Sequence, residues 1–191
     1  MSARLVIMGP QGSGKGTQAA RISEHFAVPA ISTGDIFRDN IARGTDLGVR
    51  AQEYTCCGEL VPDSITNAMV RERLGAADAL DGFILDGYPR NAAQVGELDA
   101  VLADLGTHLD AVIQLTAERD ELLARMRRRA EIEGRDDDTA DVIARRLDIY
   151  DAETAPLAQA YAARGLLVSV DGIGEIDEVT GRVLDALGTR V

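Results

Sequence analysis

The chain has 191 residues, of which 46% are hydrophobic and 27% charged, a balance that fits one compact domain with an aliphatic core. The formal net charge of −12 argues against nucleic acid or an anionic membrane surface as a partner. We find no signal peptide, no apolar run that could span a bilayer and no well-spaced cysteine pair, so we expect a cytoplasmic protein with reduced thiols.

The hydrophobic pattern predicts short strands that alternate with helices. We expect strands at residues 4–8, 29–32, 82–86, 111–115 and 166–170. We expect helices at residues 16–26, 35–42, 63–74, 91–105, 118–130, 140–164 and 176–187, and Pro156 should kink or divide the long one. This alternation is typical of an α/β fold in which helices cover both faces of a five-stranded parallel sheet.

Two stretches interrupt the alternation, at residues 32–61 and 129–138. Both should project from strand ends, where ligands bind in such sheets. We therefore expect a single domain over residues 1–191, with a small insert at 32–61 and a short loop at 129–138.

The first strand leads directly into a glycine-rich loop. Residues 9–17 read Gly-Pro-Gln-Gly-Ser-Gly-Lys-Gly-Thr and match the phosphate-binding pattern G-x-x-x-x-G-K, with a strand before and a helix after. Backbone N–H groups in such a loop, together with the helix start, bind the phosphates of a nucleoside triphosphate, and the chain's only lysine adds a compact positive charge. We assign these contacts to Gly12, Ser13, Gly14, Lys15, Gly16 and Thr17.

The loop departs from the pattern directly after its lysine. The usual hydroxyl residue is replaced by Gly16, and the hydroxyl follows one position later at Thr17. We therefore expect phosphates and water to hold Mg²⁺, with no direct protein ligand. Asp86 ends the third predicted strand and could organise water around the ion, although a turn or cap residue is the alternative reading.

Several arginines are candidates for phosphate contacts. Arg90 follows a Gly-Tyr-Pro turn at the end of the third strand. Helical spacing places Arg129 and Arg146 on the same faces as core residues, whereas Arg125 and Arg128 fall on another side, where we expect solvent. An inward arginine needs an anion, which could be phosphate or the acidic run at 136–138. Phosphoryl transfer requires cations and positioning but no covalent group, so this pattern favours it.

Together these motifs resemble the adenylate kinases, within the nucleoside monophosphate kinases, over nearly the whole chain. The resemblance rests on residues 9–18, on 31–35 with Arg38, on 58–62, on 86–90 with Gln94, and on Arg135 with 137–139 and Arg146. It implies reversible Mg²⁺-dependent transfer of the γ-phosphoryl group of ATP to AMP, giving two ADP.

The resemblance also implies roles for individual residues. The transferring group would be neutralised by Lys15, Arg90, Arg129, Arg135 and Arg146. ATP would further contact Arg129 and Gly174. AMP would contact Thr33, Arg38, Glu59, Leu60, Val61, Gly87, Tyr88, Pro89, Arg90, Gln94, Arg135 and Arg146. Of these, Thr33 and Gln94 would favour adenine.

The chain differs from many bacterial relatives, which carry a long lid, some with four zinc-binding cysteines. Residues 129–135 leave room only for a short loop, so we expect no structural zinc, and we also expect a monomer. Two alternatives stay open, namely a UMP or CMP kinase and a nucleotide-binding regulator without turnover. Thr33 with Gln94 speaks against the first, and the complete arginine set speaks against the second.

Overall fold

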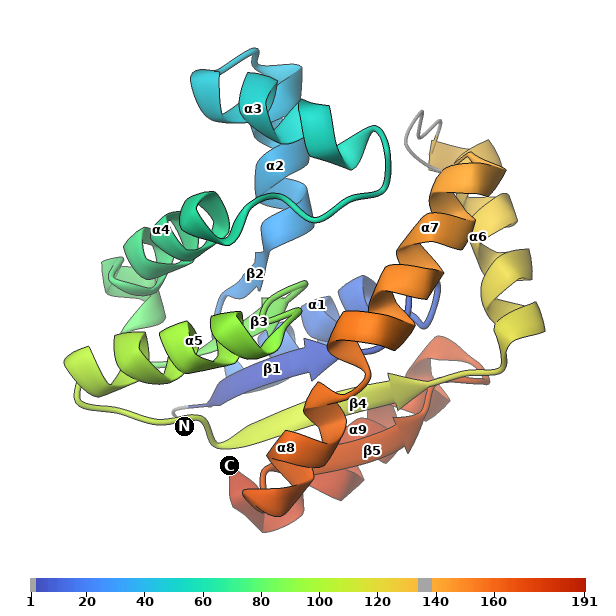
Figure 1. Ribbon diagram of the computed structural model, residues 1–191. Coiled ribbons are helices and arrows are strands. Elements are labelled where there is room, and N and C mark those ends of the chain that lie inside the picture. The colour runs from blue at the N-terminus through green and yellow to red at the C-terminus, as the bar shows by residue number, and fades with distance from the viewer. Residues whose placement is uncertain (1–2, 134–138) are drawn as a thin grey trace.

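The computed structural model describes residues 3–133 and 139–191, with backbone alone at 129–133 and 189, and it is built around a parallel sheet (Figure 1). The strands lie in the order β2-β3-β1-β4-β5. Their bounds are β1 Arg4–Met8, β2 Ala30–Ser32, β3 Phe83–Asp86, β4 Ala111–Thr116 and β5 Leu167–Asp171. The predicted strands and the predicted fold class are confirmed, with strand ends shifted by a residue at most.

The sheet is buried on both faces because successive side chains of each strand point to opposite sides. Leu5 and Ile7 of β1 pack with α1 (Lys15–Phe26) and α9 (Ile176–Leu187). Val6 and Met8 face the opposite cluster, which contains residues of α4 (Asp63–Leu74), α5 (Ala92–Asp104) and α8 (Leu157–Ala163). The central strand β1 therefore has apolar neighbours on both sides, and the loop after it begins at a fixed position.

The predicted helix at 140–164 is divided. It consists of α7 (Ala140–Ile149), a π-helical turn at Tyr150–Thr154, and α8. Pro156 immediately precedes α8, as expected of a residue that has no N–H and tolerates only the start of a helix. The Ala155 N–H bonds to the carbonyl of Tyr150, five residues back, which is the pattern of the π turn.

The interval 32–61 contains two helices, α2 (Thr33–Ala42) and α3 (Asp46–Thr55), and the sequence predicted only part of the first. Helix α3 has a polar sequence, and its narrow buried face consists of the small residues Gly48 and Ala51, which give a weak hydrophobic pattern. The sequence nevertheless contains a helix start signal, because Thr45 caps α3. Its hydroxyl accepts a hydrogen bond from the Gly48 N–H at 3.1 Å.

Helix α6 (Arg119–Glu133) extends further than predicted, so residues 129–133 are helical and not part of a loop. The extension contains good helix formers such as arginine, alanine and glutamate, and no glycine interrupts it before position 134. The remainder of the predicted loop, 134–138, lies outside the described residues. Leu122 and Met126 of α6 pack against Ile143 and Leu147 of α7, so the two helices form one arm, which stands apart from α2 and α3 (Figure 1).

Within the described residues, no helix combines the length and the apolar character that a membrane crossing requires.

The contact between α2 and α3 allows a stability prediction. A Cβ on Gly48 would lie 2.2 Å from the Asn40 carbonyl oxygen, so Gly48→Ala must push the two backbones apart. We expect the free energy of unfolding to fall by about 1–3 kcal/mol, the usual cost of overpacking. Gly96→Ala in α5 is the matched control, because a Cβ there meets nothing within 4 Å. It should raise the free energy of unfolding by roughly 0.5–1 kcal/mol. Equal effects in urea unfolding would contradict this view of the α2–α3 contact.

Candidate functional site

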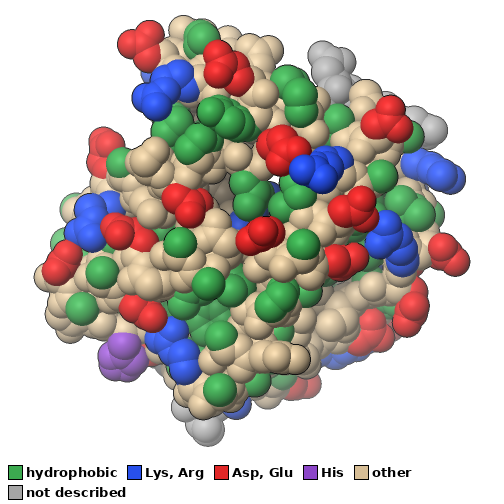
Figure 2. Space-filling model, in the orientation of Figure 1, with side chains coloured by type: hydrophobic (Ala, Val, Ile, Leu, Met, Phe, Trp, Pro, Cys, Tyr) green, Lys and Arg blue, Asp and Glu red, His purple; other side chains and the backbone are tan. Residues whose placement is uncertain are grey.

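A cavity of about 1150 Å³ lies at the carboxyl end of the sheet, between the α2–α3 insert and the α6–α7 arm. Figure 2 shows the surface hollowed in this region, with acidic side chains around the opening. Most of the residues predicted to bind nucleotide line it, namely Gly12, Ser13, Gly14, Lys15, Gly16, Thr17, Thr33, Arg38, Glu59, Leu60, Val61, Asp86, Gly87, Tyr88, Pro89, Arg90, Gln94, Arg146 and Gly174. The side chain of Arg129 and the whole of Arg135 lie outside the described residues.

The glycine-rich loop forms a cradle at one end of the cavity. Gly14 precedes α1 with φ of 91°, and as the N-cap residue it offers no side chain to the first N–H groups of this helix. Gly12 has φ of 84°, and a Cβ there would lie 2.9 Å from the Leu122 carbonyl oxygen, so a side chain at this position would collide with α6. A helix start that exposes N–H groups to a cavity is suited to bind an anion.

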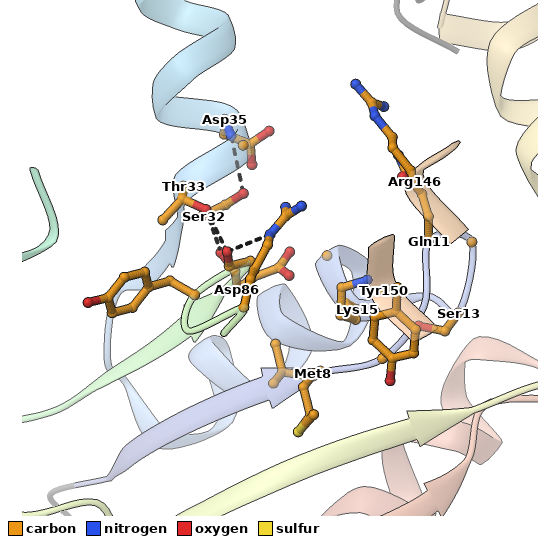
Figure 3. Close-up of a pocket in the computed structure, with 18 of the residues that line it drawn as sticks. Met8, Gln11, Ser13, Lys15, Ser32, Thr33, Asp35, Asp86, Arg146 and Tyr150 are labelled. Carbon is orange, nitrogen blue, oxygen red and sulfur yellow. Dashed lines mark hydrogen bonds between the residues drawn. The ribbon is translucent and has the colours of Figure 1, made fainter. Parts of the chain in front are cut away.

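Two side chains of the loop lie within the cradle (Figure 3). Lys15 folds back so that its Nζ donates to the Pro10 carbonyl oxygen at 3.0 Å. The Ser13 hydroxyl is buried and has no hydrogen-bond partner among the described residues. A buried polar group without a partner is costly, which fits a site whose ligand completes its hydrogen bonds.

Arg90 lies deep in the cleft, where β3 ends. Its Nε donates to the Gly87 carbonyl oxygen at 2.8 Å, and its own carbonyl accepts from the Thr154 hydroxyl at 2.8 Å. Enclosure by protein lowers the pKa of the Arg90 guanidinium, the nearby Asp86 acts in the opposite direction, and Arg146 and Arg38 lower the pKa further. A desolvated cation with two like charges nearby would be stabilised by an anion in the cavity.

Gln94 is held by protein groups at both ends of its amide. Its Oε1 accepts from the Arg90 N–H at 2.7 Å, and its Nε2 donates to an Asp63 carboxylate oxygen at 2.7 Å. The amide orientation follows from its partners, because an N–H only donates and a carboxylate only accepts. Asn91 also donates to Asp63, at 3.1 Å, and its side-chain oxygen caps α5 by accepting from the Gln94 N–H.

Thr33 is buried beside the same strand end. Its hydroxyl donates to the Gly87 carbonyl oxygen at 3.1 Å. Its position therefore depends on the backbone turn that also holds Arg90.

Two arginines of α7 connect the arm to the insert. Arg146 donates from Nη2 to the Thr55 carbonyl oxygen at 3.2 Å, which confirms that it faces the cavity. Arg145 forms an ion pair with Glu59 at 2.7 Å. The two sides of the cleft are therefore in contact at the C-terminal end of α3.

Arg125 and Arg128 were predicted to face solvent, which holds for the exposed Arg128, whereas Arg125 is partly buried, and both side chains also line the cavity. Arg125 pairs with Glu121 at 2.7 Å and donates to the Gly172 carbonyl oxygen at 3.0 Å. Helical phasing alone could not show this, since the contact depends on the β5–α9 loop approaching α6 in space.

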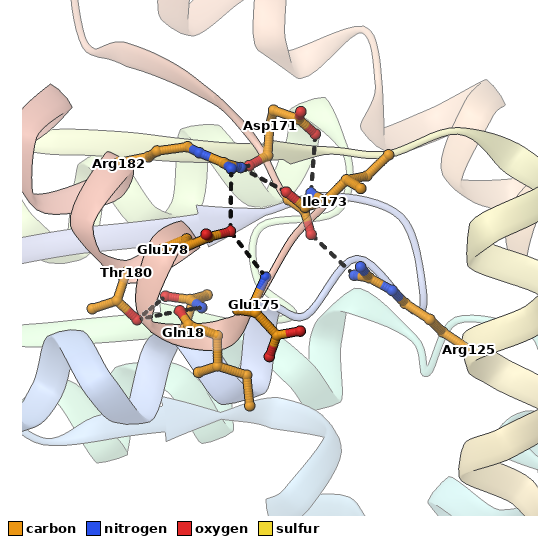
Figure 4. A network of polar contacts seen from close by, with 10 residues as sticks. Gln18, Arg125, Asp171, Ile173, Glu175, Glu178, Thr180 and Arg182 are labelled. Atoms are coloured by element: carbon orange, nitrogen blue, oxygen red, sulfur yellow. Dashed lines mark hydrogen bonds and ion pairs between the residues drawn. The ribbon is translucent and has the colours of Figure 1, made fainter.

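The β5–α9 loop is also held by contacts from α9 (Figure 4). Arg182 of α9 donates to the carbonyl oxygens of Asp171 and Ile173, at 3.0 and 2.6 Å. Gly174 lies in this loop with φ of 129°, a conformation that favours glycine. The segment predicted to contact a nucleotide base is thus fixed by hydrogen bonds from two helices.

Comparison with known proteins agrees with this geometry. A family model described as adenylate kinase matches residues 7–166. The adenylate kinase of Bifidobacterium longum (strain NCC 2705) is 61% identical over 184 residues, which cover 96% of this chain and 99% of the relative. The chain belongs to the adenylate kinase family. Adenylate kinases of Nocardioides sp. (strain ATCC BAA-499 / JS614) and Thermobifida fusca (strain YX) are 58% and 51% identical, over 96% and 98% of this chain and 96% and 99% of the relatives.

Membership of the adenylate kinase family confirms the predicted function. The chain is an enzyme, a nucleoside monophosphate kinase that acts on adenine nucleotides. The phosphate cradle and the arginines opposite it are features that such an activity requires.

The partial burial of Arg90 predicts a separation of stability from activity. Among the described residues, the side chain forms one hydrogen bond, to Gly87, yet gives up part of its hydration in the cleft. We expect Arg90→Met to leave the free energy of unfolding within about 1 kcal/mol of wild type, or to raise it. ADP formation should fall by at least about 100-fold, because we expect Arg90 to be a cation at the reacting phosphates.

Arg164→Met is the control for this variant. Arg164 pairs with Asp99 through two hydrogen bonds of 2.8 and 3.0 Å away from the cavity, so its replacement should leave activity unchanged. A large loss of stability in Arg90→Met would show instead that the residue is mainly structural.

Proposed function

We propose that this enzyme transfers the γ-phosphoryl group of Mg²⁺-bound ATP to AMP, reversibly, and forms two molecules of ADP. The observation that carries the proposal is the convergence of cationic side chains from separate elements on one cavity, beside an uncapped helix start. The described contributors are Lys15 of α1, Arg38 of α2, Arg90 after β3, Arg125 and Arg128 of α6, and Arg146 of α7.

This arrangement suits transfer between two phosphate groups. The reaction needs little covalent participation from the protein, but the donor and acceptor must lie in line and charge on the equatorial oxygens must be neutralised. Cations on one element could serve one nucleotide, whereas cations on opposite sides of a cleft can contact both. We propose that Lys15, Arg90 and Arg146 neutralise the transferring group, together with Arg129 and Arg135.

We assign the donor and acceptor to opposite ends of the cavity. The phosphates of ATP would lie on the glycine-rich loop, and its base would contact the fixed loop around Gly174 and Arg125. AMP would lie between α2, α3 and the turn after β3, with its phosphate on Arg38 and Arg90 and its base near Val61 and Gln94. The cavity supports this assignment because lining residues 87–90 and Gln94 follow β3, which lies on the other side of β1 from β5 and its loop.

The residues near the cradle fit a magnesium ion held mainly through water. The Asp86 Oδ2 lies 3.7 Å from the position that a Cβ on Gly16 would occupy, so the carboxylate faces the start of α1. Asp86 would bind the ion through water, with the Thr17 hydroxyl close by, and the ion would neutralise phosphate charge. Among the described residues, no group of three His, Cys, Asp or Glu side chains could hold a metal by itself.

We further propose that the enzyme is a monomer of the cytoplasm. Large exposed hydrophobic side chains are scattered over several elements of the described chain, namely Val49, Leu80, Leu105, Ile173 and Ile176. Such scatter does not favour an obligate interface. The two free cysteines fit a reducing compartment.

The proposal is tested by measuring ADP formation from ATP and Mg²⁺ with AMP, UMP, CMP or GMP as acceptor. We expect AMP to exceed each of the other nucleotides by at least about 100-fold in kcat/KM. UMP or CMP as the best acceptor would show that the pyrimidine alternative is correct.

Lys15→Met tests whether the lysine takes part in phosphoryl transfer. It should lower kcat by at least about 100-fold while the free energy of unfolding changes little, because the ammonium acts on charge that develops during transfer. Near-normal turnover in this variant would remove Lys15 from the mechanism.

The Asp63 contact predicts how the acceptor base is selected. Asp63→Ala should leave the Gln94 amide held only through its Oε1, by the Arg90 N–H, so that the Nε2 no longer presents a fixed donor to the base. We expect the ratio of kcat/KM for AMP to that for CMP to fall about tenfold, whereas Asp63→Asn, which keeps an acceptor oxygen, should have a smaller effect. An unchanged ratio in Asp63→Ala would show that the orientation of Gln94 does not depend on Asp63.

A further inference from the structure

The adjacent cysteines at the end of α3 form an unusual pair. Cys56 and Cys57 are both exposed and free, and their sulfur atoms lie 3.3 Å apart. The αR conformation of Cys56, with φ of −63° and ψ of −27°, belongs to the turn that ends the helix. Hydrogen bonding from Cys56, followed by its charge, raises the pKa of the Cys57 thiol, as expected when two sulfurs share a proton.

The geometry of this pair opposes a disulfide. A relaxed disulfide needs sulfurs about 2.05 Å apart and Cα atoms at least about 4.4 Å apart. Consecutive Cα atoms are only about 3.8 Å apart across a trans peptide. A single thiophilic atom that bonds to both sulfurs would not need an S–S bond, and the sulfurs could remain separated.

We propose that Cys56 and Cys57 form a two-thiolate binding site for a trivalent arsenical or a similarly soft thiophilic centre. With an organoarsenic oxide, two S–As bonds form and the arsenic–oxygen bond is broken. The two thiol protons leave with the oxide oxygen as one water molecule. The oxidation states of sulfur and arsenic do not change, so no oxidant is required.

The position of this pair links its occupancy to the nucleotide cavity. Cys56 lines the cavity, and the residues on either side of the pair contact α7 through the Arg146 bond to the Thr55 carbonyl and the Arg145–Glu59 ion pair. A Cβ on the intervening Gly58 would lie 3.1 Å from the Val142 carbonyl oxygen, so there is little spare room between this turn and α7. An arsenic atom with its organic group, bonded to Cys56, would occupy part of the cavity beside this turn and displace it.

This displacement should act mainly on the acceptor side. The turn continues directly into residues 59–61, which we have proposed to contact AMP, and this part of the inference rests on that proposed function. We expect the adduct to raise the KM for AMP roughly tenfold, which corresponds to about 1.4 kcal/mol of lost binding. The KM for ATP should change much less, because the glycine-rich loop lies at the other end of the cavity.

The experiment treats the full-length enzyme with phenylarsine oxide and measures intact mass and steady-state kinetics. We expect one adduct per chain, formed with loss of one water, that a dithiol such as dithiothreitol removes and an equal thiol concentration of a monothiol does not. Cys57→Ser keeps the cavity-lining Cys56 and should show normal basal kinetics but no stable adduct.

The outcomes separate the binding site from the proposed function. No adduct, or an adduct that persists in Cys57→Ser, would overturn the two-thiolate site. An adduct on the wild type that leaves the KM for AMP unchanged would overturn its link to the acceptor side. If the untreated enzyme formed no ADP, the proposed function would fail, while the mass measurement would still decide whether the dithiol site exists.

Discussion

The start of α1 is the constraint on which the rest of the site depends. Gly14 cannot cap the helix with a side chain, so the first N–H groups of α1 are available to an anion from the cavity. Their position is fixed because the loop follows β1, which is central in the sheet and packed on both faces. The site therefore combines a rigid phosphate cradle with flanking elements that are attached less extensively to the core.

Those flanking elements approach each other across the cavity from opposite sides. The α6–α7 arm has its own small cluster of apolar residues, and α3 packs with α2 in another, so each can move with limited disturbance of the main core. In the described part of the chain, the bond from Arg146 to the Thr55 carbonyl and the exposed Arg145–Glu59 ion pair join them. Contacts of this kind are weak enough to be exchanged for contacts with nucleotide. Closure around the substrates would then depend on both the insert and the arm.

The structure could be predicted from the sequence wherever a local pattern of residues determines it. The β-branched run at residues 4–8 and the glycine spacing after it predicted β1 and its loop, and Pro156 marked the division before α8. Helix α3 was missed because its buried face consists of small residues in a polar sequence. Arg125 was misjudged because its partner, the Gly172 carbonyl, lies 47 residues away, and the bond arises only when β5 and α9 have packed. Likewise, Gln94 was predicted as a contact for the base, but its orientation depends on Asp63, which periodicity does not connect to it.

The central claim is that one cavity holds two nucleotides at once, with their phosphates between the cradle and the arginines. The most direct test is a crystal structure of the enzyme with a mimic in which two adenosines are joined by a chain of phosphates. We expect the phosphate chain to run from the loop at residues 9–17 to Arg90, with one adenine beside Gly174 and the other beside Gln94. A mimic whose second adenosine lies outside the cavity, or whose phosphates avoid Arg90, would contradict it.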